Sequence, residues 1–296
     1  MSLQSSSPQR LPLQPLPAIM IEPLVRMGLL EDLGRAGDLT SDAIAPAGVT
    51  ATAALVSRQP GVVAGLDLAG LAFRLIDDRV TIVRHRQDGD HVVPGDAIAE
   101  IRGPARAILT AERTALNFLC RLSGIASATA SIVAAVAETK TRIVCTRKTT
   151  PGLRTVEKYA VRAGGGANHR FGLDDAMLIK DNHIAIAGSI RTAIARARSG
   201  IGHLVKIEVE VDTLAQLEQA MAEGVDAVLL DNMSLEQLRR AVEIVAGRAV
   251  TEASGRVTPE TAPAIAATGV DLISIGWLTH SAPVLDIGLD FAVGEN

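Results

Sequence analysis

The second half of the chain alternates short apolar runs with amphipathic stretches of helical spacing. The apolar runs cover 143–145, 176–179, 206–211, 227–230, 249–253 and 272–275. Helix signals lie between them, such as Thr150–Pro151 and Thr258–Pro259 at helix starts and Gly224 at a helix end. Successive strand–helix units predict a parallel sheet. Because no nucleotide-binding glycine fingerprint accompanies them, the pattern favours a β/α barrel over a doubly wound sheet.

The region from 19 to 103 has a different sequence pattern, in which short β-like runs are separated by turns. One run covers 50–57, and another, 88–101, contains a turn signal at Pro94–Asp96. A helix is predicted over Pro23–Asp32. These features together predict an α+β domain with a small sheet.

A long alanine-rich helical stretch joins the two regions, from about 105 to 138, with a candidate break at Ser123–Gly124. We therefore divide the α/β chain into a tail (1–18), an N-terminal domain (19–122) and a barrel (123–280). The tail is rich in Ser, Gln and Pro and lacks an apolar core of signal-peptide length.

Composition narrows the function classes. The net charge is −4 and aromatic residues make up 2% of the chain, so an extended basic face with stacking aromatics is absent and nucleic acid is not expected as a partner. Apolar runs stay short of the roughly 18 residues that a membrane span needs. Cys120 and Cys145 give neither a disulfide framework nor metal spacing, which favours a reduced, cytoplasmic setting.

Charged, polar or small residues stand at the ends of the predicted strands. In chain order these residues are Arg147 and Lys148, Lys180, Glu210, Asp231, Ser254 and Gly276. In a β/α barrel the carboxyl ends of all strands point to one rim, where active sites lie. We therefore expect these side chains to converge although they are far apart in sequence.

Cations concentrate between Thr146 and His183, which predicts a site for a small, heavily anionic ligand. Arg147 and Lys148 precede a capped helix start, where backbone N–H groups favour anions. The triple glycine 164–166 could simply end a helix, but three in a row also suggest backbone that passes close to a ligand. Asn168, His169 and Arg170 follow directly, and arginine suits carboxylate or phosphate.

The strictly alternating run 206–211 puts Lys206, Glu208 and Glu210 on one face. Such a face either lines a site inside the barrel or is the wet side of an edge strand. Glu210 and Asp231 on neighbouring strands could hold a hydroxylated sugar or Mg²⁺, which prefers carboxylate oxygen.

Small residues end the last two strands. Ser254–Gly255 and Gly276 would let backbone N–H groups face a phosphate, as the loops after the final strands of such barrels commonly do. Arg113 lies in an apolar helix, where nothing local separates a surface ion pair from a functional role.

The 88–101 segment resembles the hammerhead of biotinyl or lipoyl carriers. A carrier needs an attachment lysine, and the first lysine of this chain is Lys140, so only the hint of a hammerhead-like sandwich remains.

These motifs resemble the quinolinate phosphoribosyltransferase family over about Ile21 to Phe291. The resemblance is carried by EDLGRAGDLTSD, AERTALNFLCRLSGIAS, the whole 146–184 stretch, VEVD, LLDNMS, EASG, GVDLISIGWLTHS and VLDIGLDF. It implies an N-terminal α/β sandwich rejoined by 281–296, an open-faced β/α barrel, and a homodimer in which each barrel is completed by its neighbour.

The resemblance also implies residue roles. Arg113 would reach into the partner's site, and Lys148 would serve the phosphoribosyl pyrophosphate (PRPP) side. The other implied sets are Arg147, His169, Arg170 and Lys180 for the pyridine dicarboxylate, Glu210 and Asp231 for ribose and Mg²⁺, and Ser254, Gly255 and Gly276 for phosphate. The chain departs from the family at Arg256, where a glycine is usual, and at Trp277, where a small residue is usual.

The expected activity is therefore transfer of phosphoribosyl from PRPP to quinolinate with decarboxylation, a step of NAD synthesis. The main alternative is a lyase or aldolase barrel that uses Lys148 or Lys180 as a Schiff-base nucleophile on a phosphorylated sugar. A non-catalytic anion-binding barrel is a third interpretation, and a relative acting on nicotinate a fourth.

Overall fold

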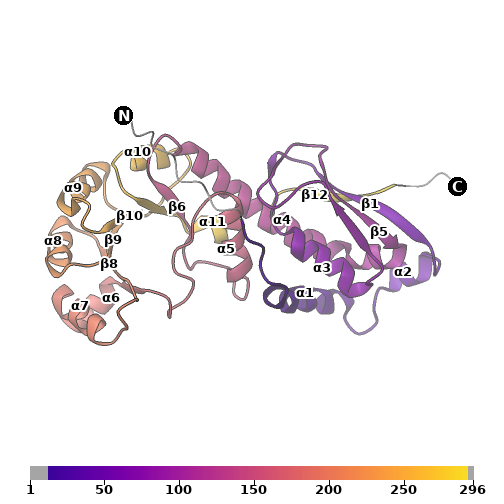
Figure 1. Ribbon diagram of the computed structural model, residues 1–296, viewed down its shortest axis with the longest axis horizontal. Helices are drawn as coiled ribbons and strands as arrows, with labels where there is room; N and C mark the ends of the chain where they lie inside the picture. Colours follow the sequence, from indigo (N-terminus) through magenta and orange to yellow (C-terminus); the bar gives the residue numbers. More distant parts are fainter. Residues whose placement is uncertain (1–12, 293–296) are drawn as a thin grey trace, which may run out of the picture.

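The computed structural model describes residues 13–292, which form two units connected by the long helix α4 (Ala105–Ala135). Figure 1 shows the strand–helix units of the second half at one end of the molecule and the N-terminal unit at the other. The expected α/β class, with an N-terminal domain and a barrel-like C-terminal domain, is confirmed.

The N-terminal unit is a four-stranded antiparallel sheet with the strand order β12-β1-β5-β3. Its strands are β1 (Thr50–Ser57), β3 (Thr81–Arg84), β5 (Ala97–Pro104) and β12 (Ile287–Ala292), and a separate short antiparallel pair consists of β2 (Gly61–Val62) and β4 (His91–Val92). Its helices are α1 (Ala18–Leu33), α2 (Leu39–Ile44) and α3 (Leu66–Ile76). Strand β12 pairs with β1 in the register Leu55 to Leu289, so the end of the chain returns to the first unit. Helix α1 begins five residues earlier than the helix predicted at Pro23.

Helix α4 runs without interruption through Ser123–Gly124, so the candidate break is wrong. Gly124 has a different purpose, because a Cβ there would overlap the carbonyl oxygen of Pro283. The glycine therefore allows the chain that returns toward β12 to cross the helix at close range. The hydroxyl oxygen of Ser123 accepts the backbone N–H of Ala64 at 3.0 Å.

The second unit is a six-stranded parallel sheet with the order β6-β11-β10-β9-β8-β7. Its strands are β6 (Arg142–Val144), β7 (Met177–Ile179), β8 (Ile207–Val211), β9 (Ala227–Asp231), β10 (Val250–Ser254) and β11 (Leu272–Ser274). Because β6 and β7 stand at the two ends of this order and do not pair with each other, the barrel is open on one side.

Helices follow the strands in alternation. They are α5 (Arg154–Ala163), α6 (Asp181–Ala187), α7 (Ile190–Ser199), α8 (Leu214–Glu223), α9 (Leu235–Val245), α10 (Ala262–Ala266) and α11 (Trp277–His280). Side chains cap several helix starts, as at Ser189, Thr213 and Ser234, which each accept a backbone N–H of the first turn.

Strand register decides which residues face the barrel interior. Leu229 on β9 is level with Glu210 on one side and Glu252 on the other, and Asp231 is level with Ser254. Because alternate residues of a strand share a face, these polar positions all lie on one side of the sheet. The intervening residues, such as Val209, Val228 and Leu230, are buried in the hydrophobic core on the opposite side.

Helix α4 belongs to both hydrophobic cores. Leu119 and Leu122 pack in the core of the N-terminal unit, and Ile132 packs in the core of the barrel. By length and composition α4 could cross a membrane, but the same composition is typical of a core helix, and its fifteen buried residues agree with that role.

Candidate active site

Two arginines at the open side of the barrel carry buried hydrogen-bond donors without partners. Arg147 follows β6, and Arg170 lies in the loop before β7. The Nε atoms of both are buried and have no hydrogen-bond partner within the described part of the chain. Burial and the neighbouring charge of Arg147 lower the pKa of Arg170 below its usual range. Unsatisfied donors of this kind suit an anionic ligand, since buried polar groups are normally paired.

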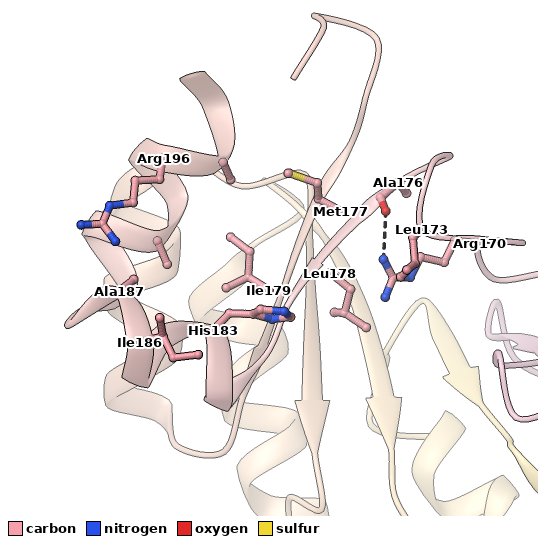
Figure 2. A pocket seen from close by; sticks show the side chains of 12 residues that line it. Arg170, Leu173, Ala176, Met177, Leu178, Ile179, His183, Ile186, Ala187 and Arg196 are labelled. Atoms are coloured by element: carbon pink, nitrogen blue, oxygen red, sulfur yellow. Dashed lines mark hydrogen bonds between the residues drawn. The ribbon is translucent and has the colours of Figure 1, made fainter. Parts of the chain in front are cut away.

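Arg170 is anchored at one end only. Its Nη1 donates to the carbonyl oxygen of Ala176 over 3.0 Å, the dashed contact in Figure 2. It borders a groove of about 470 Å³ along β7, which is otherwise lined mostly by apolar side chains such as Leu178 and Ile186. The guanidinium thus retains donors for a ligand.

A second constellation lies inside the barrel, around a cavity of about 520 Å³. His169 Nε2 lies 2.9 Å from Glu208 Oε2 and 3.7 Å from Glu252 Oε1. Burial, and then the charge of Glu208, raise the pKa of Glu252 to about 7. Burial lowers the pKa of His169, but the hydrogen bond to Glu208 and the charge of Glu252 outweigh it and raise that pKa overall.

The spacing of His169, Glu208 and Glu252 could suit a metal ion, because one ligand atom of each lies within 4.8 Å of the others. The hydrogen bonds argue against it. His169 Nδ1 accepts the backbone N–H of Arg170 at 2.8 Å, so in the neutral ring the proton is on Nε2. A metal at Nε2 would require that proton to move to Nδ1 and would break the contact with Arg170.

Lys180 and Glu210 meet at the rim, as their strand-end positions predicted. Lys180 Nζ lies 2.6 Å from Glu210 Oε2. Asp231, which ends the next strand, accepts the side-chain amide of Asn232 at 2.6 Å. The two carboxylates therefore stand on neighbouring strands, and their hard oxygen atoms fit a magnesium ion in donor chemistry.

The last loops also come together at this rim. A Cβ at Gly276 would lie 2.8 Å from Cδ of Lys148, so the glycine makes room for the lysine chain. Thr279 donates its hydroxyl to the carbonyl of Lys148 at 2.7 Å. Gly255 has a φ of 113°, and a Cβ there would overlap the side chain of Asn232.

The two departures from the family pattern have different surroundings. Trp277 donates its indole N–H to the carbonyl of Val257 at 2.8 Å and so ties the loop after β10 to the start of α11. Arg256 is exposed and has a φ of 46°, a left-handed conformation that is uncommon for a residue with a Cβ.

Two glycines of the triple glycine, Gly164 and Gly166, serve packing. A Cβ at Gly164, which caps the end of α5, would overlap the backbone oxygen of Ala126 on α4, and one at Gly166 would lie 2.8 Å from Thr129. These two glycines therefore allow close contact with helix α4. Their close contacts are with the protein itself, and the predicted approach of this backbone to a ligand stays a prediction.

Three residues of these constellations were missed by sequence reasoning as site residues. Lys158 is fully buried, and its Nζ donates to the carbonyl of His169 at 2.8 Å and to Cys145 Sγ at 3.1 Å. Glu252 lies inside the apolar run 249–253, and a single charged residue in a buried strand is a sequence signal for a functional site. Glu208 was noted only as part of an alternating face.

Arg113 stands apart from the other candidates. It is exposed on α4 and borders a groove together with Leu24, Met27 and Phe118 of the N-terminal unit. That groove shares no lining residue with the cavities of Arg170 and His169.

Comparison with known proteins gives matches along most of the chain. Residues 38–123 match the family model "Quinolinate phosphoribosyl transferase, N-terminal domain", and residues 125–290 match "Quinolinate phosphoribosyl transferase, C-terminal domain". A probable nicotinate-nucleotide pyrophosphorylase [carboxylating] of Bacillus subtilis is 46% identical over 277 residues, which cover 94% of this chain and 95% of the relative. The nicotinate-nucleotide pyrophosphorylase [carboxylating] of Mycobacterium leprae is 45% identical over 90% of this chain and 95% of its own.

Solved structures agree with these sequence matches. NadC from Streptococcus pyogenes superposes with a TM-score of 0.90 at 44% identity, covering 94% of this chain and 99% of that one. The nicotinate-nucleotide pyrophosphorylase from Francisella tularensis gives a TM-score of 0.91 at 40% identity, covering 95% and 99%.

Proposed function

From the premise that the chain belongs to the quinolinate phosphoribosyltransferase family, we propose that it transfers phosphoribosyl from PRPP to quinolinate in NAD synthesis. The products are nicotinate mononucleotide, pyrophosphate and CO₂. The observation that carries the proposal is the pair of buried Nε donors of Arg147 and Arg170 at the open side of the barrel, which have no hydrogen-bond partner among residues 13–292. A flat aromatic ring with two carboxylates is the kind of anion that such donors fit.

The dicarboxylate would lie among Arg147, Arg170 and Lys180. Arginine forks bind planar carboxylates through two parallel N–H bonds, and Lys180 adds a point charge. The family resemblance puts His169 in the same set, although both its ring nitrogens are engaged by Glu208 and Arg170.

Lys148, Glu210 and Asp231 would handle the phosphoribosyl donor. Glu210 and Asp231 present carboxylate oxygens to ribose hydroxyls and to Mg²⁺, directly or through water. When bound, Mg²⁺ would offset negative charge on the pyrophosphate. Lys148 lies at the rim and would offset charge on the same leaving group.

The chemistry then needs mainly positioning and electrostatics. The pyridine nitrogen attacks the anomeric carbon of ribose while the bond to pyrophosphate breaks and its electron pair leaves with the pyrophosphate. The ring carboxylate beside the nitrogen departs as CO₂, and its bonding pair remains on the ring carbon, where the quaternised nitrogen stabilises it until solvent supplies a proton. No general base is required, because orientation of the two reactants supplies much of the acceleration.

The backbone after β10 and β11 would hold the ribose phosphate. Ser254, Gly255 and Gly276 carry small side chains or none, so their backbone N–H groups could face a phosphate, and the Trp277 bond to Val257 supports the loop. This arrangement is the usual phosphate grip of β/α barrels.

A second copy of the chain would complete the site. Helix α1 buries Ile21, Val25 and Leu29, while several of its other apolar residues, such as Met27 and Leu30, are exposed. Leu39 and Ile44 on α2 are exposed as well. A surface of this kind suits a protein interface, and Arg113 at its edge would then enter the neighbouring site.

The test uses quinolinate labelled in the carboxyl group next to the ring nitrogen. Incubation with PRPP and Mg²⁺ should release labelled CO₂ and form nicotinate mononucleotide in equal amounts. Arg147→Ala and Arg170→Ala should each weaken quinolinate binding at least about tenfold, as expected for loss of a charge-assisted contact. Unchanged affinity in both variants would refute the carboxylate pocket.

The lyase alternative is less well supported. Lys180 Nζ lies 2.6 Å from Glu210 Oε2, so the nitrogen would have to leave this carboxylate before it could attack a carbonyl carbon. Borohydride treatment in the presence of substrate should therefore trap no adduct, whereas a trapped lysine adduct would favour the lyase.

A further inference from the structure

His169 is held by the protein on three sides. Its Nε2 lies 2.9 Å from Glu208 Oε2, its Nδ1 accepts the backbone N–H of Arg170 at 2.8 Å, and its carbonyl oxygen accepts Lys158 Nζ at 2.8 Å. Only 13% of its side chain is exposed. Both ring nitrogens are therefore engaged before any ligand arrives.

The roles of the two nitrogens follow from this geometry. Nδ1 accepts a hydrogen bond, so the neutral ring carries its proton on Nε2, and Nε2–H donates a hydrogen bond to the Glu208 carboxylate. A substrate carboxylate needs a hydrogen-bond donor, and the only N–H of the neutral His169 ring is already bonded to Glu208. The ring does contact the backbone nitrogen of Arg170, whose buried Nε has no hydrogen-bond partner in the part of the chain that the structure describes.

Glu252 approaches the His169 ring from β10, which is separated from β8, the strand of Glu208, by β9. Its Oε1 lies 3.7 Å from His169 Nε2, is buried and has no hydrogen-bond partner in the described residues. Glu208 and Glu252 therefore flank the same ring nitrogen from β8 and β10, which restricts how the imidazole can tilt.

We propose that His169, Glu208 and Glu252 are positioning residues that act through Arg170, and that His169 does not itself contact the substrate. The unit fixes the backbone at residue 170 and thereby aims its guanidinium at a carboxylate of an aromatic acid. The proposal rests on the proposed function for the identity of that acid, quinolinate.

A double-mutant cycle separates this role from direct contact. kcat/KM for quinolinate is measured for the wild type, Glu208→Leu, Arg170→Ala and the double variant. Glu208→Leu should lower kcat/KM about tenfold in the wild type and less than about twofold in the Arg170→Ala background, because residues that act through one group are not additive. The same loss in both backgrounds would overturn the proposal, since His169 would then act on substrate independently of Arg170.

A conservative variant at Glu208 and a variant at a remote glutamate test whether Glu208→Leu simply disrupts the fold. Glu208→Gln keeps an oxygen that accepts the Nε2 proton, so it should restore kcat/KM to within about threefold of wild type. KM for PRPP should stay within about twofold in both Glu208 variants, and the exposed Glu218→Leu on α8 should match the wild type. Equal losses with Gln and Leu, or a parallel rise in KM for PRPP, would refute the positioning role.

A readout without substrate keeps the two proposals distinct. In ¹⁵N-histidine spectra at pH 8, His169 should carry its proton on Nε2, and quinolinate should leave that tautomer unchanged. A ring protonated on Nδ1 in the free protein would overturn the inference. Failure of the wild type to bind quinolinate would instead refute the proposed function, while the same spectrum would still decide how His169 is held.

Discussion

The ammonium of Lys180 lies 2.6 Å from a carboxylate oxygen of Glu210 and links the carboxyl ends of two neighbouring strands, β7 and β8. Lys180 is assigned to the dicarboxylate and Glu210 to the ribose and Mg²⁺. The pair therefore joins the two halves of the proposed site, and each side chain limits where the other can point.

Because they are in contact, changes at Lys180 and Glu210 should not be additive. Lys180→Met and Glu210→Leu should each lower kcat/KM at least about tenfold. The loss of kcat/KM in the double variant should be smaller than the product of the two single losses, by a factor that corresponds to a coupling energy of about 1 kcal/mol or more. The control is Lys140→Met, which removes an exposed ion pair with Asp271 near the start of β6 and should leave kcat/KM within about twofold. Fully multiplicative losses would show that the pair is unimportant in the working enzyme.

Arg113 should act in the neighbouring subunit. Arg113→Ala and Lys148→Ala homodimers should both be nearly inactive. After unfolding and refolding of an equal mixture, about a quarter of the wild-type activity should return, because half of randomly formed dimers are mixed and each restores one of two sites. Activity that stays at the level of the separate variants would argue against a shared site, and analytical ultracentrifugation checks that the dimers formed.

Stability should fall with rising pH because of Glu252. Burial and the charge of Glu208 raise its pKa from 4.5 to about 7 in the folded chain. The folded state then binds more protons than the unfolded state, so the stabilisation is complete below about pH 4.5 and is lost as the pH rises through 7. Glu252→Gln should therefore gain about 3 kcal/mol relative to the wild type between about pH 4.5 and 8 in urea unfolding. Parallel pH curves for the two proteins would contradict this.

Gly164 should be needed for packing rather than for catalysis. Gly164→Ala would push a methyl group into the backbone of α4 at Ala126, and overpacking of this kind costs about 2 to 3 kcal/mol of unfolding free energy. Gly202→Ala is the control, because nothing lies within 4 Å of the added Cβ, and it should stay within about 1 kcal/mol of the wild type. Urea denaturation measures both, and equal stability of the two variants would refute the packing role.

Arg256→Gly should stabilise the chain by about 0.5 to 1 kcal/mol, because glycine adopts the left-handed φ of 46° without strain. Ala246→Gly, at a φ of 49° at the end of α9, should give a similar gain and serves as the control for stability alone. If Arg256 adds a phosphate contact, its variant should also raise KM for PRPP, while Ala246→Gly should not. Thermal unfolding and initial rates measure the two effects, and a loss of stability in Arg256→Gly would contradict the strain argument.

The rim of the barrel could be read from the sequence because its geometry follows from strand direction. Most of the apolar runs end at a charged or polar residue, and parallel strands bring all those ends to one edge. Lys180 and Glu210 meet for that reason. The break predicted at Ser123–Gly124 failed because the same glycine that weakens a helix also permits close passage of another segment, here Pro283.

The sequence by itself determined the α/β class, the order of the strands and helices, and the cations and carboxylates available at the rim, since these depend on local periodicity and on the residues at the end of each strand. Only the tertiary structure decided how His169 is held. Its contacts with Glu208 on β8, Glu252 on β10 and Lys158 on α5 depend on sheet register and on the packing of a helix against the barrel. Those are long-range relations that no local pattern of residues encodes.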